Sequence, residues 1–127
     1  MIIGTGIDIV EIQRLKSSID KYGDAFLEHF LTRREMEELP PNGEQRLQSS
    51  AGRWAAKEAV AKALGTGFGT ECEWHDICIC NNQAGAPSAF LSGNAAKTAE
   101  ALQICRIHIS ISHENKFACA VAIAEGK

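Results

Sequence analysis

The sequence predicts a single α+β domain over residues 1–127, in which a mainly antiparallel sheet packs against one long helix. Residues near both ends alternate between apolar and small or polar side chains, as half-buried strands do. An alanine-rich segment in the middle has the length of a long helix. No repeat, linker or low-complexity tract interrupts the 127 residues, a length at which one domain buries roughly two-thirds of its unfolded surface.

The first strand is predicted over residues 2–12, where apolar positions alternate. Asp8 lies on the same side of this strand as Gly4 and Gly6. We expect this side, which has few side chains beside a carboxylate, to let a ligand approach the backbone closely. Residues 11–22 follow as an amphipathic helix.

Short helices are predicted over residues 24–39, with Thr32 as an N-cap and Glu35 completing a capping box. The Pro-Pro-Asn-Gly segment at residues 40–43 ends them. The long helix then runs from about 44 to 64, and the glycine-rich run that follows ends it because glycine tolerates the left-handed position.

Two strands around a turn are predicted at residues 75–81 and 87–91, followed by a helix at residues 93–103. A β-hairpin is predicted from the strands at residues 107–112 and 117–124. One face of the last strand carries only alanines, Ala118, Ala120, Ala122 and Ala124. This face would pack either against a second copy of the chain or against the chain's own helices.

Composition excludes several classes. The net charge of −3 argues against wholesale nucleic-acid binding, and no apolar run approaches the roughly 20 residues that span a bilayer. The N-terminus lacks the pattern of a secretory signal, so a cytoplasmic location is expected. Five cysteines without a C-x-x-C pair are expected to be reduced, buried residues, with Cys78 and Cys80 on one face of a strand.

Asp8 and Glu58 are the best candidates for a hard-cation site, because magnesium prefers oxygen ligands and bridges to substrate phosphates. The alternative is that Glu58 forms an i,i+4 ion pair with Lys62 on the long helix. The cluster of Arg53, Lys57, Glu58 and Lys62, followed by a glycine-rich loop, favours phosphate and metal together.

His113 opens the hairpin turn and could donate a hydrogen bond to a phosphate, although most histidines in turns are simply solvated. Nucleophilic catalysis by Ser112 with His113 is not expected, because adjacent strand residues point to opposite faces. The glycine-rich loop is not a Walker loop, since it follows its helix instead of opening it.

Four segments closely resemble the holo-acyl-carrier-protein synthases, the small bacterial 4′-phosphopantetheinyl transferases. They are GIDIVEI at 6–12, GRWAAKEA at 52–59, KALGTG at 62–67 and ISISH at 109–113. The match spans nearly the whole chain in order, and four motifs at this spacing form a specific pattern.

The resemblance implies transfer of 4′-phosphopantetheine from coenzyme A to a serine of apo acyl carrier protein, releasing adenosine 3′,5′-bisphosphate. It also implies a homotrimer with active sites at subunit interfaces. Asp8 and Glu58 match the magnesium ligands (Mg2+), and Lys62 matches a lysine beside the phosphates. We hypothesise that a water or hydroxide near magnesium and Glu58 accepts the serine proton, while Lys62 stabilises or protonates the leaving phosphate.

Arg53 and His113 would bind coenzyme A phosphates, helped by the backbone around Gly65, Gly85 and Pro87. At residues 85–87 the family often has Gly-Lys-Pro, so Ala86 removes a lysine and puts contacts to the nucleotide end in doubt.

Arg14 matches a position that resembles the carrier-docking arginine, and Lys21 shares its helix face; an ordinary solvated face is the alternative. Trp54 stands where phenylalanine is usual. Two rival functions use the same residues: magnesium-dependent pyrophosphate hydrolysis, and non-catalytic binding by a trimer. The carrier pathway and the choice between magnesium and manganese are left open.

Overall fold

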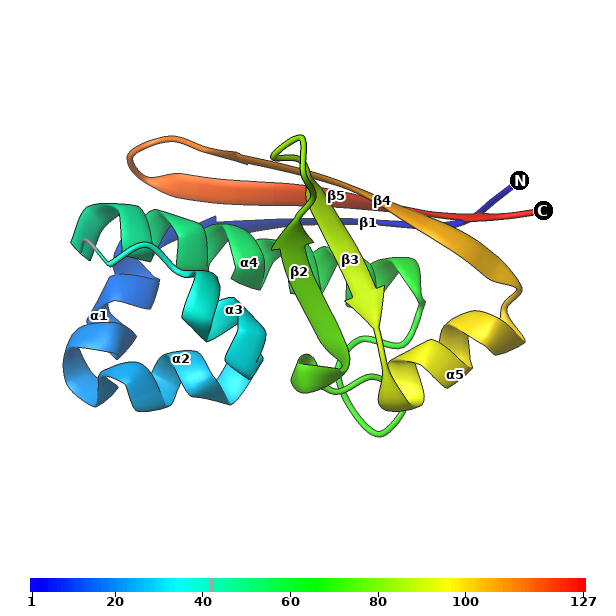
Figure 1. Cartoon of the computed structure of the whole chain (residues 1–127), viewed down its shortest axis with the longest axis horizontal. Helices are drawn as coiled ribbons and strands as arrows, with labels where there is room; N and C mark the ends of the chain where they lie inside the picture. The colour runs from blue at the N-terminus through cyan, green and yellow to red at the C-terminus, as the bar shows by residue number, and fades with distance from the viewer. Residues whose placement is uncertain (42) are drawn as a thin grey trace.

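The computed structural model describes residues 1–41 and 43–127 of the chain. The elements are, in chain order, β1 (Ile2–Glu11), α1 (Ile12–Tyr22), α2 (Asp24–Phe30), α3 (Arg33–Glu38), α4 (Gly43–Ala63), the 3-10 turn η1 (Trp74–Asp76), β2 (Ile77–Asn81), β3 (Pro87–Leu91), α5 (Gly93–Ala101), β4 (Ile104–His113) and β5 (Phe117–Gly126) (Figure 1). The predicted α+β domain with an antiparallel sheet is confirmed.

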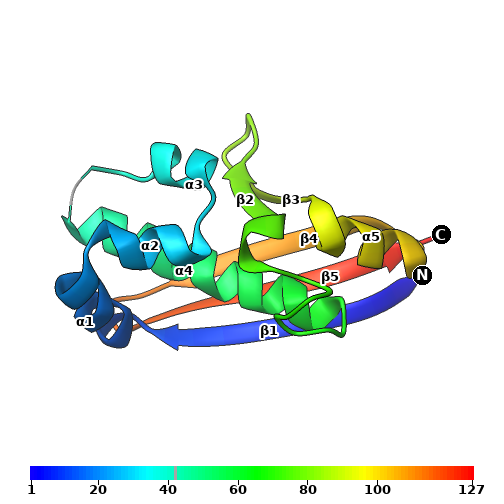
Figure 2. The same ribbon diagram turned by 90° about the horizontal axis from the view of Figure 1, so that it is seen from below.

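The main sheet has three long strands in the order β1-β5-β4, and both pairs are antiparallel. β2 and β3 form a separate antiparallel pair. Figure 2 shows α4 running along the sheet, with α1, α2 and α3 at one end and β2, β3 and α5 toward the other. β1 and β4 are therefore the two edges of the main sheet, and α4 covers its inner face.

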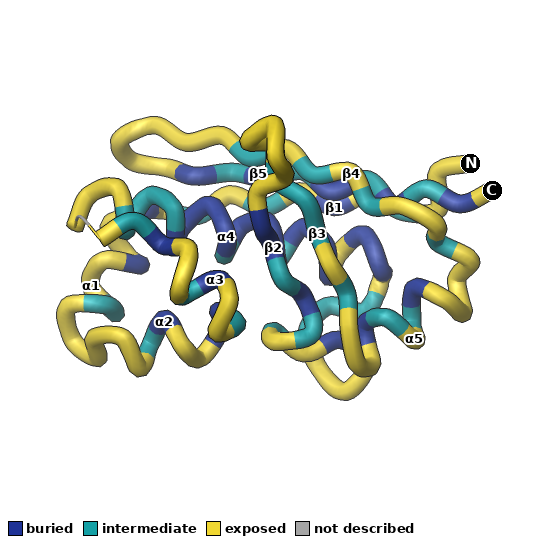
Figure 3. The backbone as a smooth tube through the Cα atoms, in the orientation of Figure 1, coloured by how far each residue is buried: buried dark blue, intermediate teal, exposed yellow. Residues whose placement is uncertain are grey.

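Helix α4 is the centre of the core, and most of it is buried (Figure 3). A Cβ on Gly6 would lie 1.9 Å from the carbonyl oxygen of Ala59, and one on Gly4 would lie 2.1 Å from that of Ala63. The glycines of β1 thus allow close contact between strand and helix. The expectation that this glycine side is open to a ligand is wrong, because the backbone of α4 occupies the space.

The boundaries of several elements differ from the prediction. The strand expected from residue 75 begins at Ile77, because Asp76 caps η1: its carboxylate accepts a hydrogen bond from the Glu73 N–H at 3.2 Å and from the Ala95 N–H at 3.1 Å. The helix expected to reach 103 ends at Ala101. The segment at residues 40–43, which is predicted to end the short helices, includes Asn42, and Asn42 lies outside the described residues.

The Thr32–Glu35 capping box is confirmed. The Glu35 N–H donates to the Thr32 hydroxyl at 3.1 Å, and the Thr32 N–H donates to the Glu35 carboxylate at 2.7 Å. The end of α4 is also as predicted, since Gly65 has a φ of 79° and donates its N–H to the Lys62 carbonyl.

The two faces of the main sheet differ in how they are covered. Its alanine face, Ala118 to Ala124 on alternate positions, is buried against the chain's own α4, which decides the alternative left open by the sequence. The opposite face carries exposed apolar side chains, with Ile7 68% and Ile9 65% exposed. Within the described residues, none of the helices has the length and apolar character needed to cross a bilayer.

Candidate active site

The first cluster of predicted residues lies where β1 passes α4. The Lys62 ammonium donates to the carbonyl oxygen of Ile7 at 2.8 Å and to the Asp8 carboxylate at 3.3 Å. Lys62 therefore pairs with the strand, whereas the ion pairs found among the described residues include none for Glu58. The i,i+4 pair between Glu58 and Lys62, the alternative considered for these residues, does not form.

The half-buried Glu58 carboxyl has a raised pKa, chiefly because burial disfavours its charged form and also because Asp8 is negative; Lys62 acts in the opposite direction. Two carboxylates that repel each other beside a partly open edge suit a divalent cation, which would remove the repulsion. Among the described residues, no group of three or more His, Cys, Asp or Glu side chains converges as a metal site. A pair of carboxylates suits magnesium, because this ion keeps several waters and uses substrate oxygens as further ligands.

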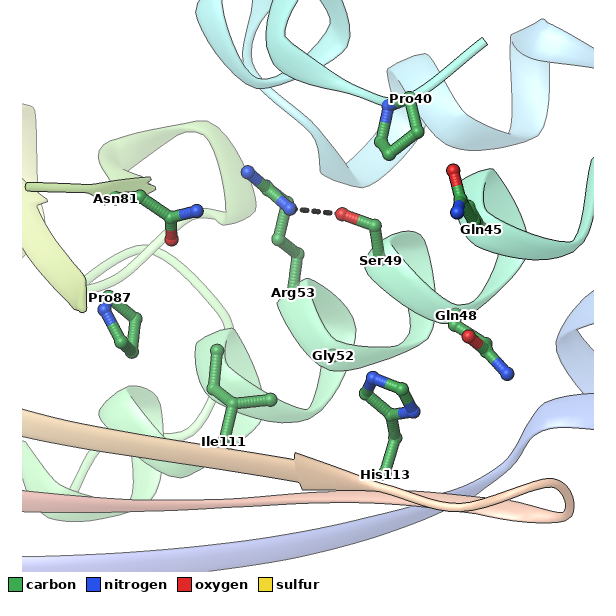
Figure 4. Close-up of a pocket in the computed structure, with 10 residues that line it drawn as sticks. All are labelled: Pro40, Gln45, Gln48, Ser49, Gly52, Arg53, Asn81, Pro87, Ile111 and His113. Carbon is green, nitrogen blue, oxygen red and sulfur yellow. Dashed lines mark hydrogen bonds between the residues drawn. The ribbon is translucent and has the colours of Figure 1, made fainter. Parts of the chain in front are cut away.

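The second cluster lines a cavity of about 490 Å³ between α4 and strand β4 (Figure 4). Arg53 and His113 border it, as does Pro87 at the start of β3. Arg53 is only 9% exposed and bonds to the Ser49 hydroxyl through one terminal nitrogen. Its buried Nε has no hydrogen-bond partner among the described residues. A largely buried guanidinium at the border of a cavity suits an anionic ligand.

Sequence reasoning missed four polar residues of this cavity, Gln45, Gln48, Ser49 and Asn81. The three from α4 precede Arg53 by eight, five and four positions, so Gln45, Ser49 and Arg53 form a polar row at helical spacing that the sequence already contains. Asn81, which follows a buried strand segment, had no comparable pattern.

Lys57 does not belong to a phosphate-binding cluster. Its ammonium is fully buried, bonds to the Glu35 carboxylate at 2.6 Å, and donates to the carbonyl oxygens of Phe30 at 2.6 Å and Trp74 at 3.2 Å. Burial lowers the pKa of Lys57, and the Glu35 charge opposes this shift. Lys57 is a structural residue, and the prediction that grouped it with Arg53, Glu58 and Lys62 is wrong.

Arg14 borders a smaller groove of about 320 Å³ that also includes Ile9 of β1 and the aromatic rings of Phe26 and Trp54. Trp54 is the aromatic filler that the sequence predicted, stacked on Phe26 with ring centroids 6.1 Å apart. Lys21 lies further along α1 and contacts the ring of Tyr22, 5.1 Å from its centroid.

The structure divides the predicted residues between the two edges of the main sheet. Asp8, Glu58 and Lys62 gather at the β1 edge, whereas Arg53 and His113 border the cavity at the β4 edge. Of the predicted loop residues, Gly65 and Gly85 adopt positive φ in turns, and neither is among the described residues that line the cavity.

Known proteins resemble this chain in sequence and in fold. The sequence model of the 4′-phosphopantetheinyl transferase superfamily matches residues 4–122. A holo-acyl-carrier-protein synthase from Solidesulfovibrio magneticus is 45% identical over 126 residues, 99% of this chain and 100% of that protein.

Two solved structures extend the comparison. The holo-acyl-carrier-protein synthase from Neisseria meningitidis has a TM-score of 0.90 at 37% identity, covering 98% of this chain and 99% of that chain. The Helicobacter pylori holo-acyl-carrier-protein synthase, solved in complex with coenzyme A, has a TM-score of 0.81 at 34% identity, covering 95% and 99%. The chain therefore belongs to the 4′-phosphopantetheinyl transferase superfamily, within the holo-acyl-carrier-protein synthase family, and is an enzyme of the transferase class.

Proposed function

We propose that this enzyme transfers the 4′-phosphopantetheine group of coenzyme A to a serine hydroxyl of an apo acyl carrier protein, releasing adenosine 3′,5′-bisphosphate. One transferase domain, residues 1–127, carries the activity. The observation that carries the proposal is the combination of the Asp8–Glu58–Lys62 cluster with an arginine-lined cavity in a chain 45% identical to a holo-acyl-carrier-protein synthase.

Asp8 and Glu58 would hold a magnesium ion. When bound, the ion supplies Lewis-acid stabilisation of the charge that develops on the pyrophosphate oxygens. Without the ion, burial and, to a smaller extent, the negative charge of Asp8 raise the pKa of Glu58, and a bound cation would offset both effects.

The chain's own residues position the reactants and move the proton. The serine oxygen forms a bond to the β-phosphorus, and the bond from that phosphorus to the oxygen of the adenylate phosphate breaks. Glu58, through a water, accepts the serine proton. Lys62, already directed toward Asp8, donates to the leaving phosphate oxygen.

The cavity would hold the nucleotide end of coenzyme A. Arg53 would pair with a phosphate through its guanidinium, and His113 would add a second donor. Pro87 borders the same space, while the backbone near Gly65 and Gly85 would contribute from the flanking turns.

The direct test is to incubate the protein with coenzyme A, magnesium and an apo acyl carrier protein, and to weigh the intact carrier. We expect the carrier to gain the mass of phosphopantetheine, and this gain to disappear with chelator and in Glu58→Ala. Glu37→Ala, at an exposed residue of α3, is the matched control and should retain activity. Breakdown of coenzyme A at the same rate with and without carrier would instead establish pyrophosphate hydrolysis.

A homotrimer with interface active sites would unite the two halves of the site. The β1 edge of one subunit, with Asp8, and the β4 edge of the next, with His113, would face each other across the interface. The exposed apolar side chains of the outer sheet face, including Ile7 and Ile9, give such an interface an apolar contribution.

Mixed trimers test this arrangement. Glu58→Gln disables one half of the site and Arg53→Gln disables the other, and the two variants would be unfolded, mixed in equal amounts and refolded. Random assembly should restore about a quarter of the wild-type activity, because each half then has an even chance of coming from the intact subunit. If both halves belong to one protomer, mixing restores nothing.

An acidic carrier protein would dock on the α1 face that carries Arg14 and Lys21. The groove beside Arg14 leads along β1 to Ile9, the neighbour of Asp8, so docking there would bring the serine near the carboxylates. The double variant Arg14→Glu/Lys21→Glu should raise the carrier KM at least tenfold and leave the coenzyme A KM unchanged. Lys97→Glu/Lys127→Glu, at two exposed lysines away from α1, changes the net charge by the same amount and is the matched control. An unchanged carrier KM in the double variant would contradict docking on α1.

A further inference from the structure

The two cysteines of β2 form a close dithiol that the proposed transfer reaction does not use. Cys78 and Cys80 lie on the same face of the strand, and their sulfur atoms are 3.0 Å apart. Cys78 is partly exposed, whereas Cys80 is fully buried. An oxidant can therefore reach the first sulfur, and the second lies within direct reach of it.

The surroundings favour reaction at Cys78. The Thr32 hydroxyl donates a hydrogen bond to its sulfur at 3.5 Å, which holds this sulfur in place beside Cys80. Arg34 of α3 lies over the ring of Phe90, 5.9 Å from its centroid, and Phe90 is the β3 partner of Cys78. A cationic side chain therefore lies close to this strand pair.

Cys80 is more deeply buried than Cys78, and its thiol is hard to ionise. Burial and the contact with Cys78 raise the pKa of its thiol to about 12, so it remains protonated at neutral pH. Such a thiol is a poor first attacker on an oxidant. It is placed instead to react with a neighbouring sulfur that has already been oxidised.

We propose that Cys78 and Cys80 form a redox-responsive dithiol, which a peroxide oxidises to an intrastrand disulfide. The Cys78 sulfur attacks one peroxide oxygen, the O–O bond breaks, and a sulfenic acid and one water form. The Cys80 sulfur then attacks the Cys78 sulfur, the S–O bond breaks, the S–S bond forms, and the oxygen leaves with the Cys80 proton as a second water. The dithiol supplies the two electrons that reduce the peroxide.

Strand geometry makes this disulfide reversible. Residues two apart on a strand are separated by roughly 6.4–6.8 Å, at the upper end of the Cα separations that disulfides span. Closing the bond draws the two positions together against the pleat. Strained disulfides of this kind are readily reduced, which suits a regulatory role better than a structural one.

The dithiol adjoins the proposed nucleotide cavity. Asn81 follows Cys80 directly and pairs with Pro87 of β3, and both residues line the cavity. Contraction of β2 on oxidation would displace them, so the coenzyme A KM should rise severalfold with less effect on kcat. This link to catalysis rests on the proposed function, whereas the chemistry of the dithiol does not.

The test treats the full-length protein with hydrogen peroxide, unfolds it, alkylates the remaining thiols and weighs the tryptic peptide of residues 63–97, which contains both cysteines and also Cys72. Fragmentation of this peptide then shows which cysteine carries the alkyl group. We expect a peptide in which Cys72 alone is alkylated and the Cys78–Cys80 pair is about two mass units lighter than its reduced, unalkylated form. Dithiothreitol should reverse this change, and Cys78→Ser and Cys80→Ser should not show it. Cys105→Ser, at an exposed cysteine, is the matched control and should still form the bond.

Three outcomes would overturn the proposal: no oxidation, oxidation of one cysteine to a sulfinic acid with a gain of about 32 mass units, or disulfides between molecules through Cys105. The peptide masses do not depend on any activity. If the bond forms but the protein proves inactive with every carrier, the dithiol stands and the proposed transfer fails.

Discussion

Replacement of Lys57 by methionine should destabilise the protein strongly, and a second lysine offers a matched comparison. Lys57 and Lys16 each form an ion pair with a nitrogen–oxygen distance of 2.6 Å. The Lys57–Glu35 pair is 0% exposed on both sides, whereas the side chains of Lys16 and Asp20 are 48% and 61% exposed. The two pairs differ mainly in burial.

Removal of one partner of a buried pair costs about 3–5 kcal/mol, because the other charge remains in the core without compensation. Lys57→Met also leaves the carbonyl oxygens of Phe30 and Trp74 without this donor, which places the loss toward the upper end. For a domain of this size the loss lowers Tm on the order of 10–20 °C. Lys16→Met removes an exposed i,i+4 pair worth roughly 0.3–0.5 kcal/mol.

Urea unfolding at neutral pH, followed by tryptophan fluorescence at one fixed protein concentration, measures both variants. The carbonyl oxygen of Trp74 accepts a hydrogen bond from Lys57, and the Trp54 and Trp74 ring centroids are 4.6 Å apart, so tryptophan fluorescence reports on this region. The double variant Lys57→Met/Glu35→Gln should recover part of the loss, since the unpaired charge is gone. A loss below about 1 kcal/mol for Lys57→Met, or equal losses for both lysines, would refute the reasoning.

Two further changes test the contact between strand and helix and the electrostatics of the site. Gly6→Ala should lower the free energy of unfolding in urea by about 1–3 kcal/mol or more, because the new Cβ would lie 1.9 Å from the Ala59 carbonyl oxygen. Gly69→Ala is the control: nothing lies within 4 Å of a Cβ there, so stability should change by less than about 0.5 kcal/mol. Equal effects of the two substitutions would contradict the close contact between β1 and α4. Glu58→Gln should raise Tm above that of the wild type at pH 8 in chelator and lose this advantage as pH falls. The raised pKa of Glu58 means that its ionisation costs native stability as pH rises through that pKa, and an amide does not ionise. A wild-type Tm equal to that of the variant at pH 8 would show that the Glu58 charge is not destabilised in the metal-free protein.

Local patterns in the sequence predicted the elements well, because the determinants lie close together in the chain. The Thr32–Glu35 capping box spans three residues and forms as predicted. The second oxygen of Glu35 accepts the Ile79 N–H at 2.7 Å, and its partner Lys57 lies on another helix. No local pattern indicates a contact between residues so far apart, so this buried pair was not predicted.

The glycines of β1 show how one pattern has two physical explanations. A strand face without side chains permits close approach, and the sequence does not say whether a ligand or a helix approaches. The structure places α4 there, with the Ala59 carbonyl nearest to Gly6.

The division of the site was partly accessible from helix geometry. Arg53 and Glu58 are five residues apart, which turns the second roughly 140° away from the first around the helix axis. They therefore cannot share one face of α4. Which strand each would meet depended on how α4 lies across the sheet, and the sequence does not contain that information.

The Lys57–Glu35 pair also determines how the end of the protein that contains α1, α2 and α3, here called the helical end, unfolds locally. Through these two side chains, α4 is joined to the end of α2 at Phe30, to η1 at Trp74 and to β2 at Ile79. Segments that share one buried polar centre cannot separate singly without breaking it, so their amide protons should exchange with solvent as one cooperative unit. The helical end then holds a preformed shape, and a partner that binds there would pay little ordering entropy.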